Sequence, residues 1–155
     1  MESAKPKHAG VHVPPPAIYA AVFATGAFLH YLRPLPLQRT RLLSLGMIII
    51  AASVCLVLWA ASTFWRARTS VLPIRPSTAL VTDGPFRFTR NPMYGAMAAA
   101  YIGAALILNS LWPLLLFPAL IILMRTFVIS REERYLETVF GSAYADYKRA
   151  VRRWL

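Results

Sequence analysis

The sequence lacks the features from which soluble enzymes and secreted proteins commonly build their sites. Its one cysteine, Cys55, lies inside an apolar run, so there is no disulfide framework and no CxxC motif. Its three histidines do not have the spacing of metal ligands on a helix and have no carboxylates clustered with them, so we expect no metal site. None of the seven glycines forms a GxGxxG pattern, which excludes a Rossmann-type cofactor loop.

Acidic residues are also scarce. Charged residues make up 15% of the chain and hydrophobic residues 57%, far from the balance of a soluble globular protein. The net charge is +11, but the basic residues lie between apolar runs rather than along one polar face, which favours anionic lipid over nucleic acid as the counter-charge. The composition predicts a single-domain, all-α integral membrane protein with about four transmembrane helices and a C-terminal interfacial amphipathic helix.

Four apolar runs are the predicted transmembrane helices, at residues 17–31, 42–65, 93–109 and 111–129. The second run contains no charged residue and is long enough to span the hydrocarbon core. The pair Asn109-Ser110 is the predicted turn between the last two runs. No run has Asp, Glu or Lys in its middle, which argues against a transporter that couples through a buried acid.

Apart from the short basic loop at residues 32–41, three polar segments lie outside these runs: an arm at residues 1–16, a loop at 66–92 and a C-terminal segment at 130–155. With four spans they share one side of the membrane. The arm, the loop and the chain from Arg125 onward hold 14 of the 17 Lys and Arg residues, so the positive-inside rule assigns this side to the cytoplasm.

Two local patterns predict how helices pack or end. Gly95, Ala99 and Gly103 recur every four residues, which predicts close approach of a neighbouring backbone. In the C-terminal segment apolar residues recur at steps of three and four, which predicts an amphipathic helix. Gly141 is expected to break that helix, with Ser142 as the N-cap of its second part.

Two polar clusters on the predicted cytoplasmic side are candidates for a site. The first, residues 80–94, reads Leu-Val-Thr-Asp-Gly-Pro-Phe-Arg-Phe-Thr-Arg-Asn-Pro-Met-Tyr and enters the third helix at Pro92 after a predicted Asn91 N-cap. That helix N-terminus suits an anion. The second, Arg131-Glu132-Glu133-Arg134, can bind a cationic or hydroxyl-bearing ligand. Each cluster alone also fits a charged flank at the membrane surface.

Together the clusters resemble the isoprenylcysteine carboxyl methyltransferase and phospholipid methyltransferase family. The likeness lies in Leu-Val-Thr-x-Gly-Pro-Phe-Arg-x-x-Arg-Asn-Pro-Met-Tyr, an apolar hairpin, and then Glu-Glu-x-x-Leu-x-x-x-Phe-Gly-x-x-Tyr-x-x-Tyr. It covers about Thr78 to Trp154, half the chain. The resemblance implies an all-helical membrane enzyme that transfers a methyl group from S-adenosylmethionine, with a lipophilic acceptor arriving from the bilayer.

The resemblance also implies roles for particular residues. Glu132 and Glu133 would hold polar groups of S-adenosylmethionine, and Arg90, Arg125 or Arg131 would orient the acceptor as catalytic-site residues. The rest of the cofactor pocket would be lined by Leu80, Val81, Phe86, Asn91, Pro92, Met93 and Tyr94.

Two positions differ from the family pattern, which often has His at Asn91 and Tyr at Phe86. Asn cannot act as a general base near neutral pH, so deprotonation of an acceptor would need another group. The acceptor stays open between an isoprenylcysteine carboxylate, a phospholipid amine, a small thiol and a terpenoid, and a non-catalytic membrane scaffold of the same fold is the alternative from another class. We expect the protein in the bacterial inner membrane, its active site facing the cytoplasm.

Overall fold

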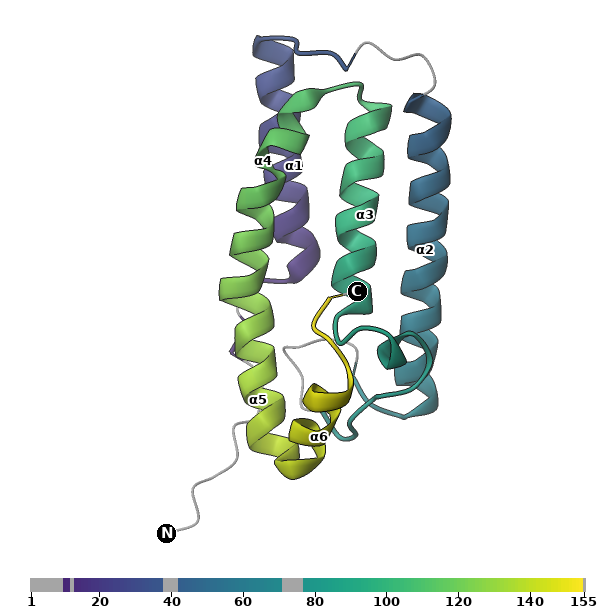
Figure 1. Cartoon of the computed structure of the whole chain (residues 1–155). Coiled ribbons are helices and arrows are strands. Elements are labelled where there is room, and N and C mark those ends of the chain that lie inside the picture. The colour runs from purple at the N-terminus through teal and green to yellow at the C-terminus, as the bar shows by residue number, and fades with distance from the viewer. Residues whose placement is uncertain (1–9, 12, 38–41, 71–76, 155) are drawn as a thin grey trace. The chain divides into compact units, whose positions relative to one another are not determined.

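The computed structural model describes residues 10–11, 13–37, 42–70 and 77–154, and it contains only helices, turns and irregular segments over these ranges (Figure 1). This confirms the predicted all-α fold. Most of the predicted polar arm, residues 1–9 and 12, lies outside the described residues.

Contacts divide the chain into two compact units. Unit 1 comprises Met1–His12, Leu58–Pro92 and Arg125–Leu155, and unit 2 comprises Val13–Val57 and Met93–Met124. Unit 1 contains the whole second cluster and the first cluster as far as Pro92. Unit 2 contains most of the apolar helices. Each unit is therefore described by itself.

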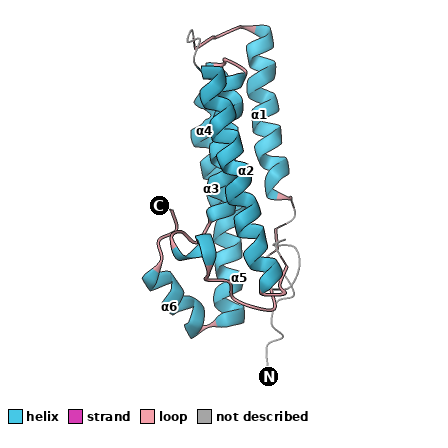
Figure 2. Ribbon diagram, turned by 90° about the vertical axis from the view of Figure 1, so that its right-hand side faces the viewer, coloured by secondary structure: helices cyan, strands magenta, loops and turns pink. Residues whose placement is uncertain are grey.

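Unit 2 is built from α1 (Pro15–Leu32), the first part of α2 (Leu42–Arg66), α3 (Pro92–Ile107) after its first residue, and α4 (Leu111–Leu123). Within this unit α1 and α4 contact each other, and Figures 1 and 2 show both helices running in the same general direction. The helix α1 begins at Pro15, inside the predicted arm, because proline has no N–H to leave unpaired and suits the first helical turn.

The predicted turn between α3 and α4 is confirmed. The helix α3 ends at Ile107, α4 begins at Leu111, and Asn109 has a φ of 52°. Asparagine tolerates this left-handed conformation better than most residues. Its side-chain oxygen accepts a hydrogen bond from the backbone N–H of Leu37 at 3.2 Å, which joins the turn to the segment after α1.

Close backbone approach holds the helices of unit 2 together. A Cβ atom on Gly46 would lie 2.6 Å from the carbonyl oxygen of Gly103, and one on Gly26 would lie 2.8 Å from Cα of Pro113. The predicted contact through Gly103 is therefore present. Gly95, from the same predicted stripe, is different, because a Cβ there would meet nothing within 4 Å.

Two helices in the described part of the chain are long and apolar enough to cross a membrane: α2, and the continuous run Leu111–Phe140. The helix α3 is apolar but shorter, with 16 residues. Only 11% of the apolar window of α2 is buried. Large apolar side chains exposed along α2 include Leu43, Leu45, Met47, Ile48, Val54, Leu58, Trp59 and Trp65. Exposed apolar surface of this kind suits a lipid environment rather than water.

The run Leu111–Phe140 continues past the predicted end of the fourth span at residue 129. After α4 it passes through the π-helix η2 (Met124–Ile129) into α5 (Ser130–Phe140) without a break. A π-helical turn has one more residue per hydrogen-bonded ring than an α-helix and keeps the chain helical. The helix therefore does not end where charged residues return at Arg131, and it continues to Phe140.

Unit 1 contains the rest of α2, the short 3-10 helix η1 (Gly84–Arg87), α5 and α6 (Ser142–Ala150). The predicted break at Gly141 is confirmed, with a φ of 54° that favours glycine. The predicted N-cap was wrong: Gly141 occupies that position, and Ser142 is the first helical residue with no side-chain cap. The helix α6 also ends at Ala150, so the predicted amphipathic helix is shorter than residues 130–155.

Candidate functional site

A cavity in unit 1 brings the two sequence clusters together. Its volume is about 60 Å³, well below the roughly 300–1,000 Å³ of typical small-molecule sites, so a larger ligand requires its walls to separate. All its lining residues belong to unit 1: Phe64, Ser70, Ser77, Ala79, Leu80, Val81, Phe86, Arg90, Asn91, Glu132, Glu133, Leu136, Tyr144 and Tyr147.

The helix η1 places Phe86 in the cavity wall. Gly84 begins the turn with a φ of 59°, and a Cβ atom there would lie 2.5 Å from Cγ2 of Thr63, so glycine is required on both grounds. The Phe86 ring is buried and meets Phe64 edge to face, with ring centroids 5.3 Å apart. The Tyr147 hydroxyl donates to the carbonyl oxygen of Phe86 at 2.7 Å. An aromatic wall of this kind can attract a cation or stack against a flat ring.

The chain after α6, residues 151–154, is hydrogen-bonded to the segment that leads into α3. The backbone N–H of Arg90 donates to the backbone carbonyl oxygen of Arg152 at 2.9 Å. The carbonyl oxygen of Arg153 accepts from Oγ1 of Thr89 at 2.9 Å and from Nδ2 of Asn91 at 3.1 Å. Asn91 therefore directly precedes α3, as predicted, while its side-chain amide holds the C-terminal segment.

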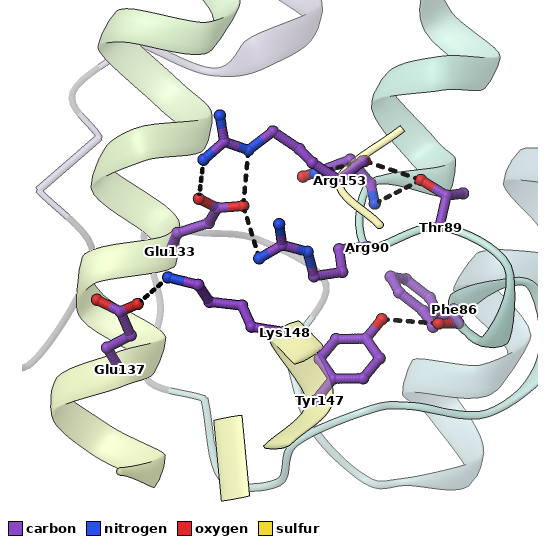
Figure 3. Close-up of polar contacts among 9 residues, drawn as sticks. Phe86, Thr89, Arg90, Glu133, Glu137, Tyr147, Lys148 and Arg153 are labelled. Atoms are coloured by element: carbon purple, nitrogen blue, oxygen red, sulfur yellow. Dashed lines mark hydrogen bonds and ion pairs between the residues drawn. The ribbon is translucent and has the colours of Figure 1, made fainter. Parts of the chain in front are cut away.

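Glu133 is the charged centre of the cavity wall, and Figure 3 shows it between two arginines. Arg153 donates to both carboxylate oxygens, with Nε 3.0 Å from Oε1 and Nη2 2.5 Å from Oε2. Nη1 of Arg90 lies 3.2 Å from Oε1. The side chains of Glu133 and Arg90 are only 9% and 10% exposed. We refer to Arg90, Glu133 and Arg153 as the Arg-Glu-Arg clamp.

The two arginines of the clamp are not equally satisfied. Arg153 makes two aligned hydrogen bonds, whereas the close approach of Arg90 Nη1 to the carboxylate is not aligned as a hydrogen bond. Nε and Nη1 of Arg90 are both buried and have no aligned hydrogen-bond acceptor among the described residues, although Nη1 pairs with Glu133 and the guanidinium also interacts with the Tyr144 hydroxyl. Leaving a buried donor unpaired typically costs about 1–3 kcal/mol, and more for a charged group.

Burial and charge alter the protonation of the groups around the clamp. Hydrogen bonding to Glu133 raises the pKa of the Arg153 guanidinium, so this side chain stays charged. Burial, reinforced by the charge of Glu133, raises the pKa of Tyr144 from 10.0 to about 12. Burial likewise raises the pKa of Tyr147. Both phenols are therefore neutral hydrogen-bonding groups at physiological pH.

Seven of the predicted site residues line this cavity: Leu80, Val81, Phe86, Arg90, Asn91, Glu132 and Glu133. The other predicted residues do not. Pro92 is buried at the first position of α3, and Met93 and Tyr94 belong to unit 2, where the Tyr94 carbonyl accepts a hydrogen bond from Tyr19. Arg125 is exposed in η2, and Arg131 donates to the carbonyl oxygen of Gly10 at 2.9 Å. Their roles stay predictions.

Several residues of the site were not singled out from the sequence. Arg153 is one of several basic residues in the C-terminal segment, and nothing in the sequence distinguishes it from the others. Tyr144 and Tyr147 could have been found from the sequence, because they form the Tyr-x-x-Tyr end of the second motif. They also belong to the apolar residues that recur in the C-terminal segment. Phe64, at the end of an apolar run, carried no signal that separates it from a lipid-facing residue.

Comparison with known proteins gives three results. The phospholipid methyltransferase family matches residues 42–143, more than half of the chain. A protein from Haemophilus influenzae described only as an uncharacterized protein is 54% identical over 35 residues, which are 23% of this chain and 56% of that protein. The protein-S-isoprenylcysteine O-methyltransferase of Schizosaccharomyces pombe is 32% identical over 72 residues, which are 46% of this chain and 30% of that enzyme. The chain thus covers about half of one relative and under a third of the other.

Fold, site and comparisons now define the class of protein. Over the described residues it is an all-helical protein with two helices long and apolar enough to cross a membrane, and the two sequence clusters meet at one cavity. The chain belongs to the phospholipid methyltransferase family, which confirms the predicted membership.

Proposed function

We propose that the protein is an integral membrane methyltransferase that transfers a methyl group from S-adenosylmethionine to a lipophilic or small acceptor at the cytosolic face of the membrane. One observation carries this proposal: the two motifs, about 40 residues apart in the sequence, form one cavity through the Arg-Glu-Arg clamp. The family membership supplies the class of reaction.

The chemistry of the cavity fits S-adenosylmethionine. This cofactor carries an ammonium, a carboxylate, ribose hydroxyls, a sulfonium cation and an adenine ring. The glutamates of the cavity can accept hydrogen bonds from the ammonium or the ribose hydroxyls, and the Arg90 N–H groups that lack an aligned acceptor can bind the carboxylate. The aromatic rings can contact the sulfonium cation or the adenine ring. The matching set of groups supports this cofactor over an uncharged ligand, although the closed walls must separate to admit it.

In the proposed reaction the bound cofactor supplies an activated methyl group, and the protein positions it and excludes water. Glu132 and Glu133 hold the polar groups of the cofactor, and Phe86 forms the apolar wall. Arg125 or Arg131 orients the acceptor, unless Arg90 does so. Asn91 supplies no base, because its amide donates to the Arg153 carbonyl and does not titrate near neutral pH. The chemistry therefore favours an acceptor that is already nucleophilic, such as a carboxylate or a thiolate.

The first candidate acceptor is an isoprenylcysteine carboxylate, which the match to the Schizosaccharomyces pombe enzyme favours. A phospholipid amine is the second, favoured by the family that matches the longest part of the chain. A small thiol is the remaining alternative. For the membrane arrangement we propose four transmembrane helices in the bacterial inner membrane, with the cavity on the cytoplasmic side because the basic residues concentrate there.

The test follows a labelled methyl group. The full chain, purified in lipid nanodiscs, is incubated with methyl-labelled S-adenosylmethionine and, separately, with membrane phospholipids, prenylcysteine analogues and small thiols. We expect label in one acceptor class only. Label in none of them, together with no thermal stabilisation by millimolar S-adenosylhomocysteine, would favour the non-catalytic scaffold, because a ligand that binds only the folded state raises its stability.

Two glutamates of α5 provide a matched pair of variants. Glu132 lines the cavity, whereas Glu137 is exposed and pairs with Lys148. Glu132→Ala is expected to reduce methyl transfer at least tenfold through weaker cofactor binding, and Glu137→Ala is expected to leave it unchanged. Equal rates in the two variants would remove Glu132 from the proposed site.

A further inference from the structure

We propose that Arg90 binds the carboxylate of the amino-acid end of the cofactor, and that Glu133 is a positioning residue that holds Arg90 in place rather than a ligand of the cofactor. This inference rests on the proposed function and refines its cofactor site, because it replaces the direct contact proposed there for Glu133 with a positioning role. It assigns Arg90 to the methyl donor, which leaves Arg125 and Arg131 as candidates for the acceptor.

The first step is the state of Arg90. Its side chain is 10% exposed and lines the cavity. Its buried Nε and Nη1 atoms lack an aligned hydrogen-bond acceptor among the described residues, and the guanidinium is faced by Glu133 and the Tyr144 hydroxyl. A guanidinium presents its N–H groups as a planar fork that matches the two oxygens of a carboxylate. A buried fork with unused donors beside a cavity is the complement of a ligand anion.

The second step is the state of Glu133. Both of its oxygens accept hydrogen bonds from Arg153, and Oε1 also lies 3.2 Å from Nη1 of Arg90. A carboxylate already held by a bidentate arginine has little capacity left for a ligand ammonium. The two arginines exceed Glu133 by one positive charge, so the clamp as a whole attracts an anion.

The third step is the place of the opposite charge. Glu132 lines the same cavity and comes from the same turn of α5 as Glu133. A cavity with an arginine fork and a separate glutamate suits a zwitterionic α-amino acid group, whose carboxylate goes to Arg90 and whose ammonium goes to Glu132. Glu132 has an interaction within the chain, and the ammonium would share this carboxylate with it or replace it. A ligand of adenosine type without that group would lack both contacts.

The experiment compares three ligands on the full chain in nanodiscs by calorimetry. S-adenosylhomocysteine has both charges, its decarboxylated analogue S-adenosyl-3-thiopropylamine lacks only the carboxylate, and methylthioadenosine lacks the whole amino-acid end. We expect the parent protein to bind the decarboxylated analogue about 10- to 100-fold more weakly than S-adenosylhomocysteine, the usual range for a charge-assisted hydrogen-bonded pair. This comparison needs no variant, so it does not depend on a substitution that folds.

The variants locate the effect. Arg90→Gln should weaken S-adenosylhomocysteine by the same factor while changing methylthioadenosine less than twofold, and the exposed Arg87→Gln should change neither. Arg90→Lys, which keeps the charge but not the fork, should restore part of the loss. Glu133→Gln should mimic Arg90→Gln, and the double variant should be no worse than either single one, because Glu133 acts through Arg90.

The outcomes separate the two proposals. Equal affinity of the parent for S-adenosylhomocysteine and its decarboxylated analogue would overturn the role of Arg90 while leaving the proposed methyltransferase function intact. Equal weakening of all three ligands by Arg90→Gln would likewise overturn it, in favour of a structural role. If none of the adenosine ligands binds the parent protein, the proposed function fails and this inference fails with it.

Discussion

Each of the two units is stabilised internally in a different way. In unit 2, α2 and α3 approach so closely that a Cβ atom on Gly46 or Gly103 would clash with the carbonyl oxygen of the other glycine. Polar side chains there contribute mainly single hydrogen bonds, such as that of Tyr101 to Pro113. In unit 1, a buried carboxylate and two arginines tie together segments that are distant in the sequence. Unit 2 should therefore be sensitive to added volume, and unit 1 to lost charge.

The largest expected effect is the removal of the clamp's carboxylate. Glu133→Ala leaves the nearly buried Arg90 and the partly buried Arg153 without their counter-charge. Breaking a buried pair from one side typically costs about 3–5 kcal/mol. We expect a loss of this order in the free energy of unfolding, measured by denaturant titration in detergent micelles.

The control for this change is Glu137→Ala on the same helix. Its pair with Lys148 is exposed, with side chains 43% and 38% accessible, so we expect a change of about 0–1 kcal/mol. If both variants unfold at the same denaturant concentration, the difference that we draw between clamp and surface does not hold.

An intermediate effect is expected from added volume in unit 2. The Cβ atom of Gly46→Ala would lie 2.6 Å from the carbonyl oxygen of Gly103, and a backbone atom cannot move aside as a flexible side chain can. Overpacking of this kind costs about 1–3 kcal/mol. The matched control is Gly95→Ala, where the new methyl group meets nothing within 4 Å. That control should be neutral or stabilising by up to about 1 kcal/mol. Equal melting temperatures for the two variants would contradict this account.

The smallest expected effect is a change in the response to alkaline pH. The pKa of Tyr144 is raised from 10.0 to about 12 in the folded protein, so the folded state holds this proton more tightly than the unfolded chain does. Its contribution to stability is complete below pH 10 and is lost as the pH rises from about 10 to about 12. Tyr144→Phe should therefore make the melting temperature fall less steeply over this interval.

The exposed Tyr31→Phe serves as the control for the alkaline profile, since its side chain is 82% accessible. It should leave the slope of melting temperature against pH unchanged. A slope that is the same for Tyr144→Phe and the parent would mean that burial of Tyr144 does not contribute to alkaline unfolding.

The fold was predictable where hydrophobicity acts over a long stretch. The uncharged run at residues 42–65 corresponds to α2, and the turn at Asn109 separates α3 from α4. The end of the fourth helix was not predictable in this way, because the Arg, Glu and Leu residues between 131 and 137 are good helix formers and nothing local stops the helix before Gly141. The change from apolar to charged residues there does not coincide with the end of the helix.

The site was predictable to the extent that its residues carry motifs. Five lining residues could be predicted because they belong to the two motifs that resemble the methyltransferase family: Phe86, Arg90, Asn91, Glu132 and Glu133. Arg153 was missed because its partner lies 20 residues away, beyond a glycine turn whose geometry determines which way the chain returns. Long-range pairing of this kind leaves no local pattern in one sequence.

The hydrogen bond from Asn91 to the Arg153 carbonyl joins residues 62 positions apart, and that separation has a consequence for how the protein is made. Ribosomes add about 5–20 residues per second, so roughly 3–12 s pass between the two residues. During that interval α3, then α4 and then Glu133 are synthesised, and Glu133 pairs with Arg153 only after a further 20 residues have been added. The contacts that Arg153 makes in unit 1 can therefore form only after all the apolar helices have been synthesised.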